Sequence, residues 1–290
     1  MFTVTLRTNS AMYLDRELVA NLRNAMGGGD VLWLDPDHAA EFQVPKLPMG
    51  IDTIWQSLSD EGVDLVAQPT EGRRKKMLLA DMDSTMIRQE CIDELAAEAG
   101  VGDRVAGITA RAMNGELDFE EALTERVGLL KGLPETTIQS VLSSRITLMP
   151  GGPTLLATMR ANGAYCALVS GGFTAFTSAI AAKLGFHEHR ANTLLAENGT
   201  LTGEVARPIL GREAKVDALE SITREKGLSP ADVLAVGDGA NDLGMLQLAG
   251  TGVALHAKPA VQAQAEIRIN HGDLTALLFI QGYTKADFVH

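Results

Sequence analysis

Four short apolar runs, each ending in a polar corner, constrain the fold more than any other feature of this 290-residue chain. The runs are MLLA (77–80), AYCALV (164–169), DVLAV (232–236) and GVAL (252–255), and the corners are DMDST, SGGF, GDGAND and HAKP. Apolar runs without polar alternation are typical of parallel strands that are buried on both faces. With helical segments between them, they predict an α/β fold with a Rossmann-like, doubly wound parallel sheet. Sites in such sheets lie beyond the carboxyl ends of the strands, where all four corners fall.

Two insertions interrupt this pattern. Residues from about 88 to 150 have helical periodicity and little strand character, which predicts a helical cap inserted directly after the first apolar run. The stretch ANTLLAENGTLTGEVARP (191–208) has two strand-like runs around Asn198-Gly199, which predicts a small β-hairpin.

The first 70 residues differ from the remainder and predict a small α/β domain of their own. Strand-like runs FTVTLRT, VLWL and VDLVAQP alternate with two stretches of helical spacing. The polar stretch TEGRRKK (70–76) predicts a solvated linker rather than a nucleic-acid patch, because no aromatic residues are interleaved with its basic ones. The predicted domains are therefore residues 1–70 and residues 77–290.

Composition excludes several classes of partner. The net charge of −12, from 25 basic and 37 acidic residues, argues against binding to nucleic acid or to an anionic membrane. No apolar stretch approaches the roughly 20 residues of a membrane-spanning helix, and the N-terminus lacks a signal-peptide pattern. The two cysteines, Cys91 and Cys166, form no C-x-x-C motif, so we expect a reducing, cytoplasmic compartment.

Four carboxylates occupy the corners: Asp81, Asp83, Asp238 and Asp242. Each one alone could be an ordinary turn or helix-capping residue. Together, at one edge of a parallel sheet, they would form clustered negative charge that needs compensation. Mg²⁺ prefers oxygen ligands and often bridges carboxylates to a phosphate, so the corners predict a Mg²⁺ site that accepts a phosphorylated molecule.

The same corners suggest a reaction. Asp81 ends a strand and is ionised at neutral pH, so it can attack phosphorus and form an aspartyl-phosphate. Asp83, two residues on, can protonate the departing alcohol and then act as the base on water. Ser170-Gly171-Gly172 follows a strand and opens a helix in this interpretation, so it either binds phosphate or merely caps the helix. Spacing alone does not distinguish Lys215 from a solvated helix lysine.

The ordered motifs DMDST, SGG, GREAK and GDGANDLGML resemble the four motifs of the haloacid dehalogenase-like superfamily. The sequence RQEC after the first motif and the two insertions are most similar to its phosphoserine phosphatase branch. The resemblance covers about residues 77 to 285. It implies Mg²⁺-dependent hydrolysis of O-phosphoserine to serine and phosphate, the last step of serine biosynthesis.

The resemblance also implies roles for residues of the core. Asp81 would be the nucleophile, Asp83 the acid and base, and both would bind the metal together with Asp238. Groups that would contact or neutralise the phosphate, or support the metal, are Ser170, Gly171, Lys215, Asn241 and Asp242. In the cap, Glu90 would face the substrate ammonium and Arg126 its carboxylate, since arginine can grip a carboxylate with two hydrogen bonds. Phe119 and Met113 would keep out water.

Other interpretations remain open. The chain could act on another small phosphomonoester, pass the phosphoryl group to another alcohol, or be a non-enzymatic phosphoaspartate receiver. Residues 1–70 faintly resemble small ACT-like amino-acid-binding regulatory modules, but an inert appendage or one that forms a homodimer is equally consistent. Without a third ligand at suitable spacing, His187 and His189 are expected to be surface residues rather than zinc ligands.

Overall fold

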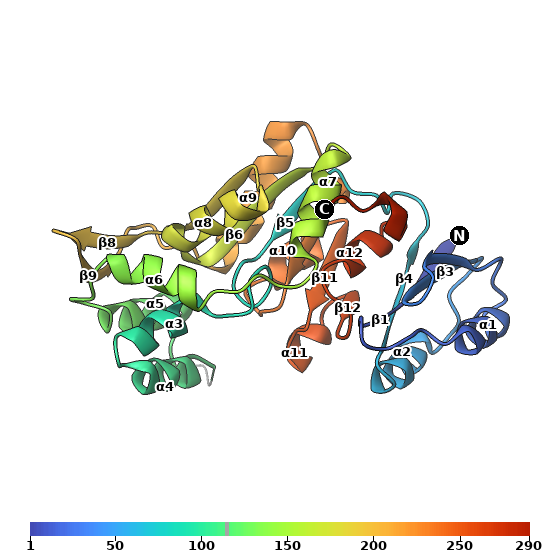
Figure 1. Cartoon of the computed structure of the whole chain (residues 1–290), viewed down its shortest axis with the longest axis horizontal. Helices are drawn as coiled ribbons and strands as arrows, with labels where there is room; N and C mark the ends of the chain where they lie inside the picture. The colour runs from blue at the N-terminus through green and yellow to red at the C-terminus, as the bar shows by residue number, and fades with distance from the viewer. Residues whose placement is uncertain (114–115) are drawn as a thin grey trace. The chain divides into compact units, whose positions relative to one another are not determined.

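The structure is a computed structural model that describes residues 1–113 and 116–290 (Figure 1). It divides into two compact units. The first comprises Met1–Leu79, Pro150–Cys166 and Leu219–His290, and the second comprises Ala80–Met149 and Ala167–Ala218. Among the described helices, none combines the length and apolar character that crossing a membrane requires.

A six-stranded sheet has the order β12-β11-β10-β5-β6-β7. Its strands are β5 (Met77–Ala80), β6 (Tyr165–Phe173), β7 (Glu188–Asn192), β10 (Val233–Gly237), β11 (Thr251–Leu255) and β12 (Ile267–Ile269). The pairs β10–β11, β11–β12 and β6–β7 are parallel. The four predicted apolar runs form β5, β6, β10 and β11, and every residue of β5, β10 and β11 is buried. The predicted α/β class with a parallel sheet is confirmed.

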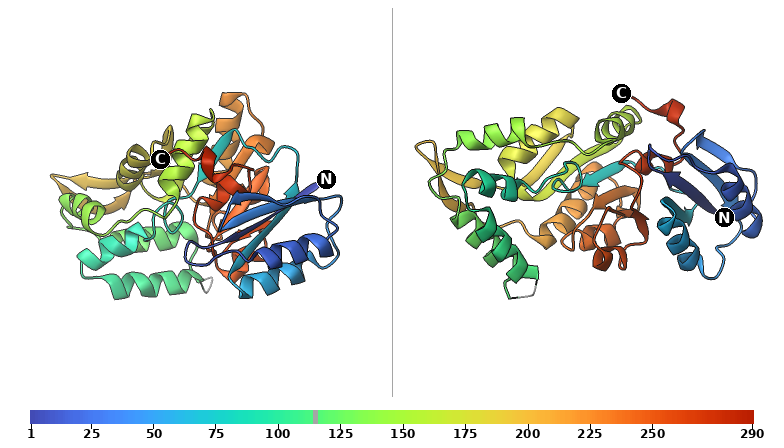
Figure 2. Two further views of the ribbon diagram at one scale, coloured as in Figure 1. Left: turned by 45° about the vertical axis from the view of Figure 1, so that its right-hand side comes forward. Right: turned by 60° about the horizontal axis from the view of Figure 1, so that its bottom comes forward.

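The second unit contains the helices and hairpin expected between the strands. Helices α3 (Cys91–Glu98), α4 (Gly102–Met113), α5 (Phe119–Gly128) and α6 (Thr136–Ser144) are drawn in green in Figures 1 and 2. A capping box between Asp118 and Glu121 starts α5. Strands β8 (Leu194–Glu197) and β9 (Thr200–Val205) pair around Asn198 and Gly199, whose φ values of 51° and 76° suit a tight hairpin turn. Helix α8 (Thr174–Leu184) belongs to this unit, and α9 (Arg212–Lys226) begins in it.

In the first unit, the N-terminal residues form an antiparallel sheet of order β2-β3-β1-β4. The strands are β1 (Phe2–Thr8), β2 (Leu32–Asp35), β3 (Ala39–Val44) and β4 (Val63–Pro69). Apolar residues of α1 (Arg16–Ala25) and α2 (Ile51–Asp60) pack on one face of this sheet, where Figure 2 shows both helices. Strand β3 was not predicted from the sequence. The remaining helices of the unit are α7 (Gly152–Ala161), α10 (Leu243–Leu248), α11 (Pro259–Gln262) and α12 (Ala276–Phe279).

Most of the stretch 70–76 is exposed, as predicted for a solvated linker, but Arg73 is an exception. Arg73 lies within it and donates to both carboxylate oxygens of Glu41 on β3, at 2.5 and 2.8 Å. Both side chains are largely buried, with 16% and 7% of their surfaces exposed. A bidentate arginine–carboxylate pair satisfies both charges together, which explains how a basic residue of this stretch can be buried.

Candidate functional site

Asp81, the first residue after β5, is buried and paired with a lysine. Its Oδ1 accepts hydrogen bonds from the backbone N–H of Met82 at 2.8 Å and from Lys215 Nζ at 2.7 Å. Lys215 lies on α9 and is 1% exposed. A buried ammonium requires a compensating partner. Lys215 is therefore a site residue that packing reveals, whereas the spacing of the sequence does not distinguish it.

Asp83 has an environment unlike that of Asp81. Its Oδ1 accepts the backbone N–H of Cys91, the first residue of α3, at 3.2 Å. Burial and, second, the charge of Glu90 raise the pKa of the Asp83 carboxyl to about 7. A carboxyl group with such a pKa can hold a proton near neutral pH and give it up again, as a general acid and base must do.

The turn between these carboxylates and α3 is held by side chains. Ser84 has a left-handed backbone with φ of 53°, which is uncommon for a residue other than glycine. Its Oγ donates to Glu90 Oε1 at 2.6 Å. Glu90 is exposed and immediately precedes α3, so its carboxylate stands beside the turn that carries Asp83.

The SGG corner lies in a strand and not at a helix start. Strand β6 continues to Phe173, and α8 begins at Thr174, so the predicted helix opening at Ser170-Gly171-Gly172 is wrong by about one turn. Ser170 is buried, and its Oγ accepts the N–H of Gly172 at 2.9 Å. A Cβ at Gly172 would lie 2.8 Å from Asp83 Oδ2, so only glycine allows this approach.

Phe119, at the start of α5, covers the glycines of the site. A Cβ on Gly171 or on Gly211 would lie 3.2 Å from its ring. The half-buried ring thus packs over backbone from two separate segments, and its predicted role as an apolar cover remains a prediction. The side chain of Met113, the other predicted cover residue, lies outside the described residues.

Arg126 lies on α5 and is half-buried. Its Nε donates to the carbonyl oxygen of Ala122 at 3.1 Å. Burial lowers the pKa of the Arg126 guanidinium, while the nearby charges of Asp93 and Glu90 act to raise it. The charge of Glu90 thus acts on Arg126, while recognition of substrate by the two residues remains a prediction. Asp93 joins them, although sequence reasoning did not single it out.

The GDGAND corner follows β10 and is held by Asp242. Asp242 is fully buried, and its Oδ2 accepts the backbone N–H groups of Asp238 at 3.1 Å and Gly239 at 3.0 Å. A Cβ at Gly239 would lie 2.2 Å from Asn241 Oδ1, so any other residue there would displace the Asn241 amide. The Asp242 carboxylate thereby holds the backbone of Asp238, and its predicted support of a metal remains a prediction.

Asp81, Asp238 and Asp242 form an acidic cluster in which one carboxylate oxygen of each residue lies within 4.8 Å of the others. Strands β5 and β10, which precede Asp81 and Asp238, are neighbours in the sheet. Three carboxylate oxygens suit a hard divalent cation. Within the described residues, no histidine belongs to this cluster, and His189 Nδ1 instead lies 3.0 Å from Thr177 Oγ1.

Asn192, the last residue of β7, is a site residue that sequence reasoning missed. Its Nδ2 donates to the carbonyl oxygens of Gly171 at 2.9 Å and Leu210 at 3.1 Å, and its Oδ1 accepts the N–H of Leu210 at 2.7 Å. The buried amide therefore joins the SGG corner to the segment that leads into α9 and Lys215. An asparagine at the end of a predicted strand would be the only indication in the sequence.

Comparisons with known proteins identify the family of this chain. The model of the haloacid dehalogenase-like hydrolase family matches residues 78–247, more than half of the chain. A phosphoserine phosphatase of Archaeoglobus fulgidus is 45% identical over 218 residues, which cover 74% of this chain and 63% of that relative. This chain thus spans less than two thirds of that relative's length.

Two solved structures extend the comparison. A HAD family hydrolase from Salmonella enterica serovar Typhi superposes with a TM-score of 0.88 at 30% identity, covering 97% of this chain and 99% of that one. A phosphoserine phosphatase solved as a phospho-aspartyl intermediate analogue superposes with a TM-score of 0.66 at 41% identity, covering 71% of this chain and 98% of that one. The chain belongs to the haloacid dehalogenase-like hydrolase family.

Two substitutions of Asn192 should destabilise the fold to different extents. Asn192→Ala leaves three partly buried backbone groups without their partner, so we expect the free energy of unfolding to fall by about 2 kcal/mol. Asn192→Asp should cost more, because a carboxylate would face two carbonyl oxygens. Urea unfolding measures both, with Asn162→Ala, at the end of α7, as the control. An Asn192→Asp variant as stable as the native protein would contradict this assignment.

Asp83 should make stability depend on pH. Because its pKa in the folded protein is about 7, above the ordinary carboxyl value of 3.8, the folded state binds the proton more tightly than the unfolded state. The carboxyl therefore costs stability progressively as pH rises from about 4 to about 7. Asp83→Asn should melt at a higher temperature than the native chain at pH 8 and at nearly the same temperature at pH 4, with a chelator present. Thermal melts across this range measure the difference, and a gap that is independent of pH would refute it.

Proposed function

We propose that this chain is a Mg²⁺-dependent phosphoserine phosphatase that hydrolyses O-phosphoserine to serine and phosphate. The observation that carries the proposal is the pair of carboxylates with unlike environments. Asp81 pairs with buried Lys215 at 2.7 Å, whereas burial raises the pKa of Asp83 to about 7. An aspartyl-phosphate mechanism needs two nearby carboxylates, one as the nucleophile and the other as the proton carrier.

In the first step, the Asp81 carboxylate attacks phosphorus, and the bond between phosphorus and the serine oxygen breaks. Asp83 gives its proton to that oxygen, so serine leaves as an alcohol. In the second step, Asp83 takes a proton from water while the water oxygen attacks phosphorus. The bond between phosphorus and Asp81 then breaks and phosphate is released.

The remaining residues position and neutralise charge. Lys215, the hydroxyl of Ser170, the backbone of Gly171 and Asn241 would contact the phosphoryl oxygens, which is the main contribution a protein makes to phosphoryl transfer. The cluster of Asp81, Asp238 and Asp242, with the backbone carbonyl of Asp83, would hold Mg²⁺. The ion would neutralise negative charge on the phosphate as the reaction proceeds.

Substrate choice would depend on the cap. A phosphorylated amino acid carries one ammonium and one carboxylate beside its phosphate, and Glu90 and Arg126 offer one fixed charge of each opposite sign. The half-buried ring of Phe119 would limit the entry of water over Gly171. The names of the relatives support the same substrate, since both the Archaeoglobus protein and the phospho-aspartyl structure are phosphoserine phosphatases. Serine production would place the reaction at the end of serine biosynthesis.

A second candidate is hydrolysis of another small phosphomonoester. The hydrolase from Salmonella, which matches almost the whole chain, carries no substrate in its name. A non-enzymatic phosphoaspartate receiver is a weaker candidate, because such a protein has no use for the raised proton affinity of Asp83.

Phosphate release from phosphoserine tests the reaction directly. We expect turnover by the native chain with Mg²⁺, loss on chelation and recovery when Mg²⁺ is restored. Asp81→Asn should lower kcat by at least about a thousandfold, because the amide is not a nucleophile. Absence of turnover by the native chain would favour the receiver.

Arg126 tests the substrate. Arg126→Ala should lower kcat/KM for phosphoserine by about a hundredfold, because a charge-assisted bidentate contact is lost. Hydrolysis of an aryl phosphate, which has no amino-acid carboxylate, should change by less than about threefold. Arg111→Ala, which removes an exposed cap arginine paired with Glu125, is the matched control. Equal losses on both substrates would point to a different phosphomonoester.

A further inference from the structure

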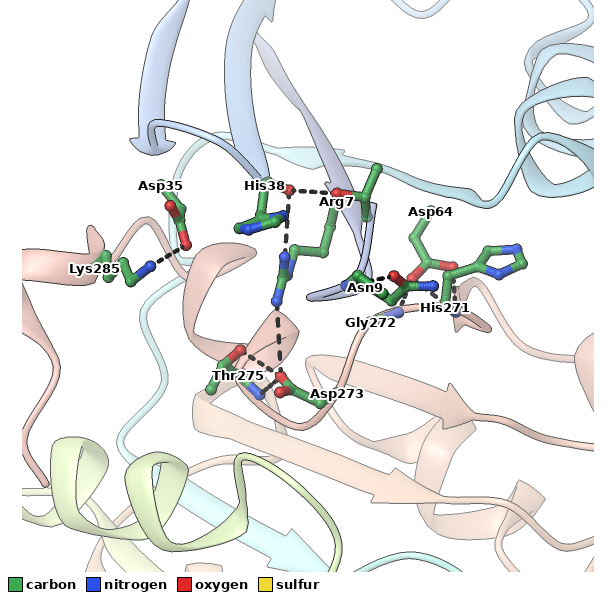
Figure 3. A network of polar contacts seen from close by, with 12 residues as sticks. Arg7, Asn9, Asp35, His38, Asp64, His271, Gly272, Asp273, Thr275 and Lys285 are labelled. Atoms are coloured by element: carbon green, nitrogen blue, oxygen red, sulfur yellow. Dashed lines mark hydrogen bonds and ion pairs between the residues drawn. The ribbon is translucent and has the colours of Figure 1, made fainter. Parts of the chain in front are cut away.

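The N-terminal sheet is fastened to the loop that follows β12 through one buried carboxylate. Asp64, on edge strand β4, is 1% exposed. It accepts backbone N–H groups from three consecutive residues: Asn270 at 2.7 Å, His271 at 3.1 Å and Gly272 at 2.7 Å (Figure 3). Successive N–H groups that converge on one acceptor form an anion-binding nest. Burial raises the pKa of Asp64, and these three donors act against that rise.

The contact around Asp64 is close. A Cβ on Gly272 would lie 3.3 Å from Asp64 Oδ2 and 3.2 Å from Arg7 Cγ on β1. Asp273, the next residue, holds the N–H of Thr275 at 2.9 Å and lies 4.0 Å from Arg7. Figure 3 shows these side chains gathered near Arg7, at the end of β1, and Asp64, at the start of β4. The loop 270–275 therefore has its backbone held from the N-terminal sheet.

The C-terminal residues cover the second face of the same sheet. Gln68 on β4 donates to the carbonyl oxygen of Ile280 at 2.6 Å, and Lys285 lies 3.0 Å from buried Asp35. Phe279 and Phe288 pack against Leu34 and Ala39. This face of the N-terminal sheet is thus occupied by the chain itself.

The loop 270–275 also holds His256, in the HAKP corner that the proposed reaction leaves without a role. His256 follows β11 and has a left-handed backbone with φ of 47°, which is costly for a residue other than glycine. Its Nε2 lies 2.8 Å from the carbonyl oxygen of Gly272, so that nitrogen carries the proton and donates. Its backbone N–H donates to Ile269 at 2.8 Å. The strained corner is held by the end of β12 and the loop that Asp64 fixes.

His256 stands at the same edge of the sheet as the metal-binding carboxylates. Strands β10 and β11 are parallel neighbours with Gly237 opposite Ala254. Asp238 follows the first of these residues directly, and His256 lies two positions after the second. The corner after β11 is therefore next to the strand end that presents Asp238.

We propose that Asp64 is a positioning residue for the catalytic edge, acting through the backbone of residues 270–272 and the side chain of His256. The N-terminal residues are in this view a fixed support of the sheet. The link from Asp64 to His256 stands on its own contacts, and only its effect on turnover rests on the proposed function.

Hydrogen exchange of the full chain tests the link without substrate. Asp64→Asn keeps the shape but replaces one acceptor oxygen by a donor, so exchange should accelerate about tenfold in peptides covering 268–276 and also in those covering 252–262. Asp52→Asn is the matched control. Asp52 is a largely exposed carboxylate on α2 that pairs with Arg268 on β12, so the substitution removes a different contact to the end of the sheet. The control should leave both peptides unchanged. Acceleration confined to 268–276 would overturn the proposal.

A double-mutant cycle tests the effect on the reaction. His256→Asn removes the imidazole while an asparagine tolerates the left-handed backbone. If both residues act through one path, Asp64→Asn and His256→Asn should each lower kcat about tenfold with little change in KM, and the double variant should be no worse than the poorer single one. Losses that multiply would mean independent effects and would overturn the proposal.

A second variant covers the case in which Asp64→Asn does not fold. Gly272→Ala places a methyl group against the Asp64 carboxylate and should accelerate exchange in the same two peptides to a smaller extent. An unchanged 252–262 peptide in this folded variant would also overturn the proposal. If the native chain does not hydrolyse phosphoserine, the proposed function fails while the exchange results still decide the structural link.

Discussion

The buried ion pair between Asp81 and Lys215 is the interaction on which the rest of the site depends. Either charge alone would be costly in this position, but at 2.7 Å each satisfies the other. The pair joins the end of β5 to α9, two elements that lie far apart in the sequence. It holds a positive charge beside the Asp81 carboxylate, where the proposed function would bring a phosphoryl group.

Several contacts around this pair are close because glycines leave room for them. Glycine at 172 admits Asp83, glycines at 171 and 211 admit the ring of Phe119, and glycine at 239 admits Asn241. These positions do not have a left-handed backbone, so close approach and not turn geometry explains their glycines. Polar side chains then fix the backbone that remains, with Asn192 behind the SGG corner and Asp242 behind the GDGAND corner.

Polar side chains of the N-terminal sheet also fix backbone groups, and they do so across much longer separations in the sequence. This sheet buries an apolar face under α1 and α2 and a more polar face under the chain's own C-terminal residues. The Asp64 carboxylate and the Gln68 amide satisfy backbone groups of residues 208 and 212 positions away. The structure groups residues 1–79 in one compact unit with the C-terminal part of the chain. The predicted domain boundary between residues 70 and 77 therefore remains a prediction.

Local sequence patterns were enough to predict the parallel sheet, the helical insertion, the hairpin and the two acidic corners. These features depend on periodicity and on turn residues, which the chain carries within a few positions. Strand β3 alternates apolar and polar residues but was not predicted, whereas β12 has only three residues and β7 is mostly polar. Long-range packing was needed to show that Lys215 is buried against Asp81, that Asn192 joins two segments, and that Asp64 binds residues 270–272. Each of these contacts depends on partners far apart in the chain, so no local pattern distinguishes such a residue from an ordinary surface one.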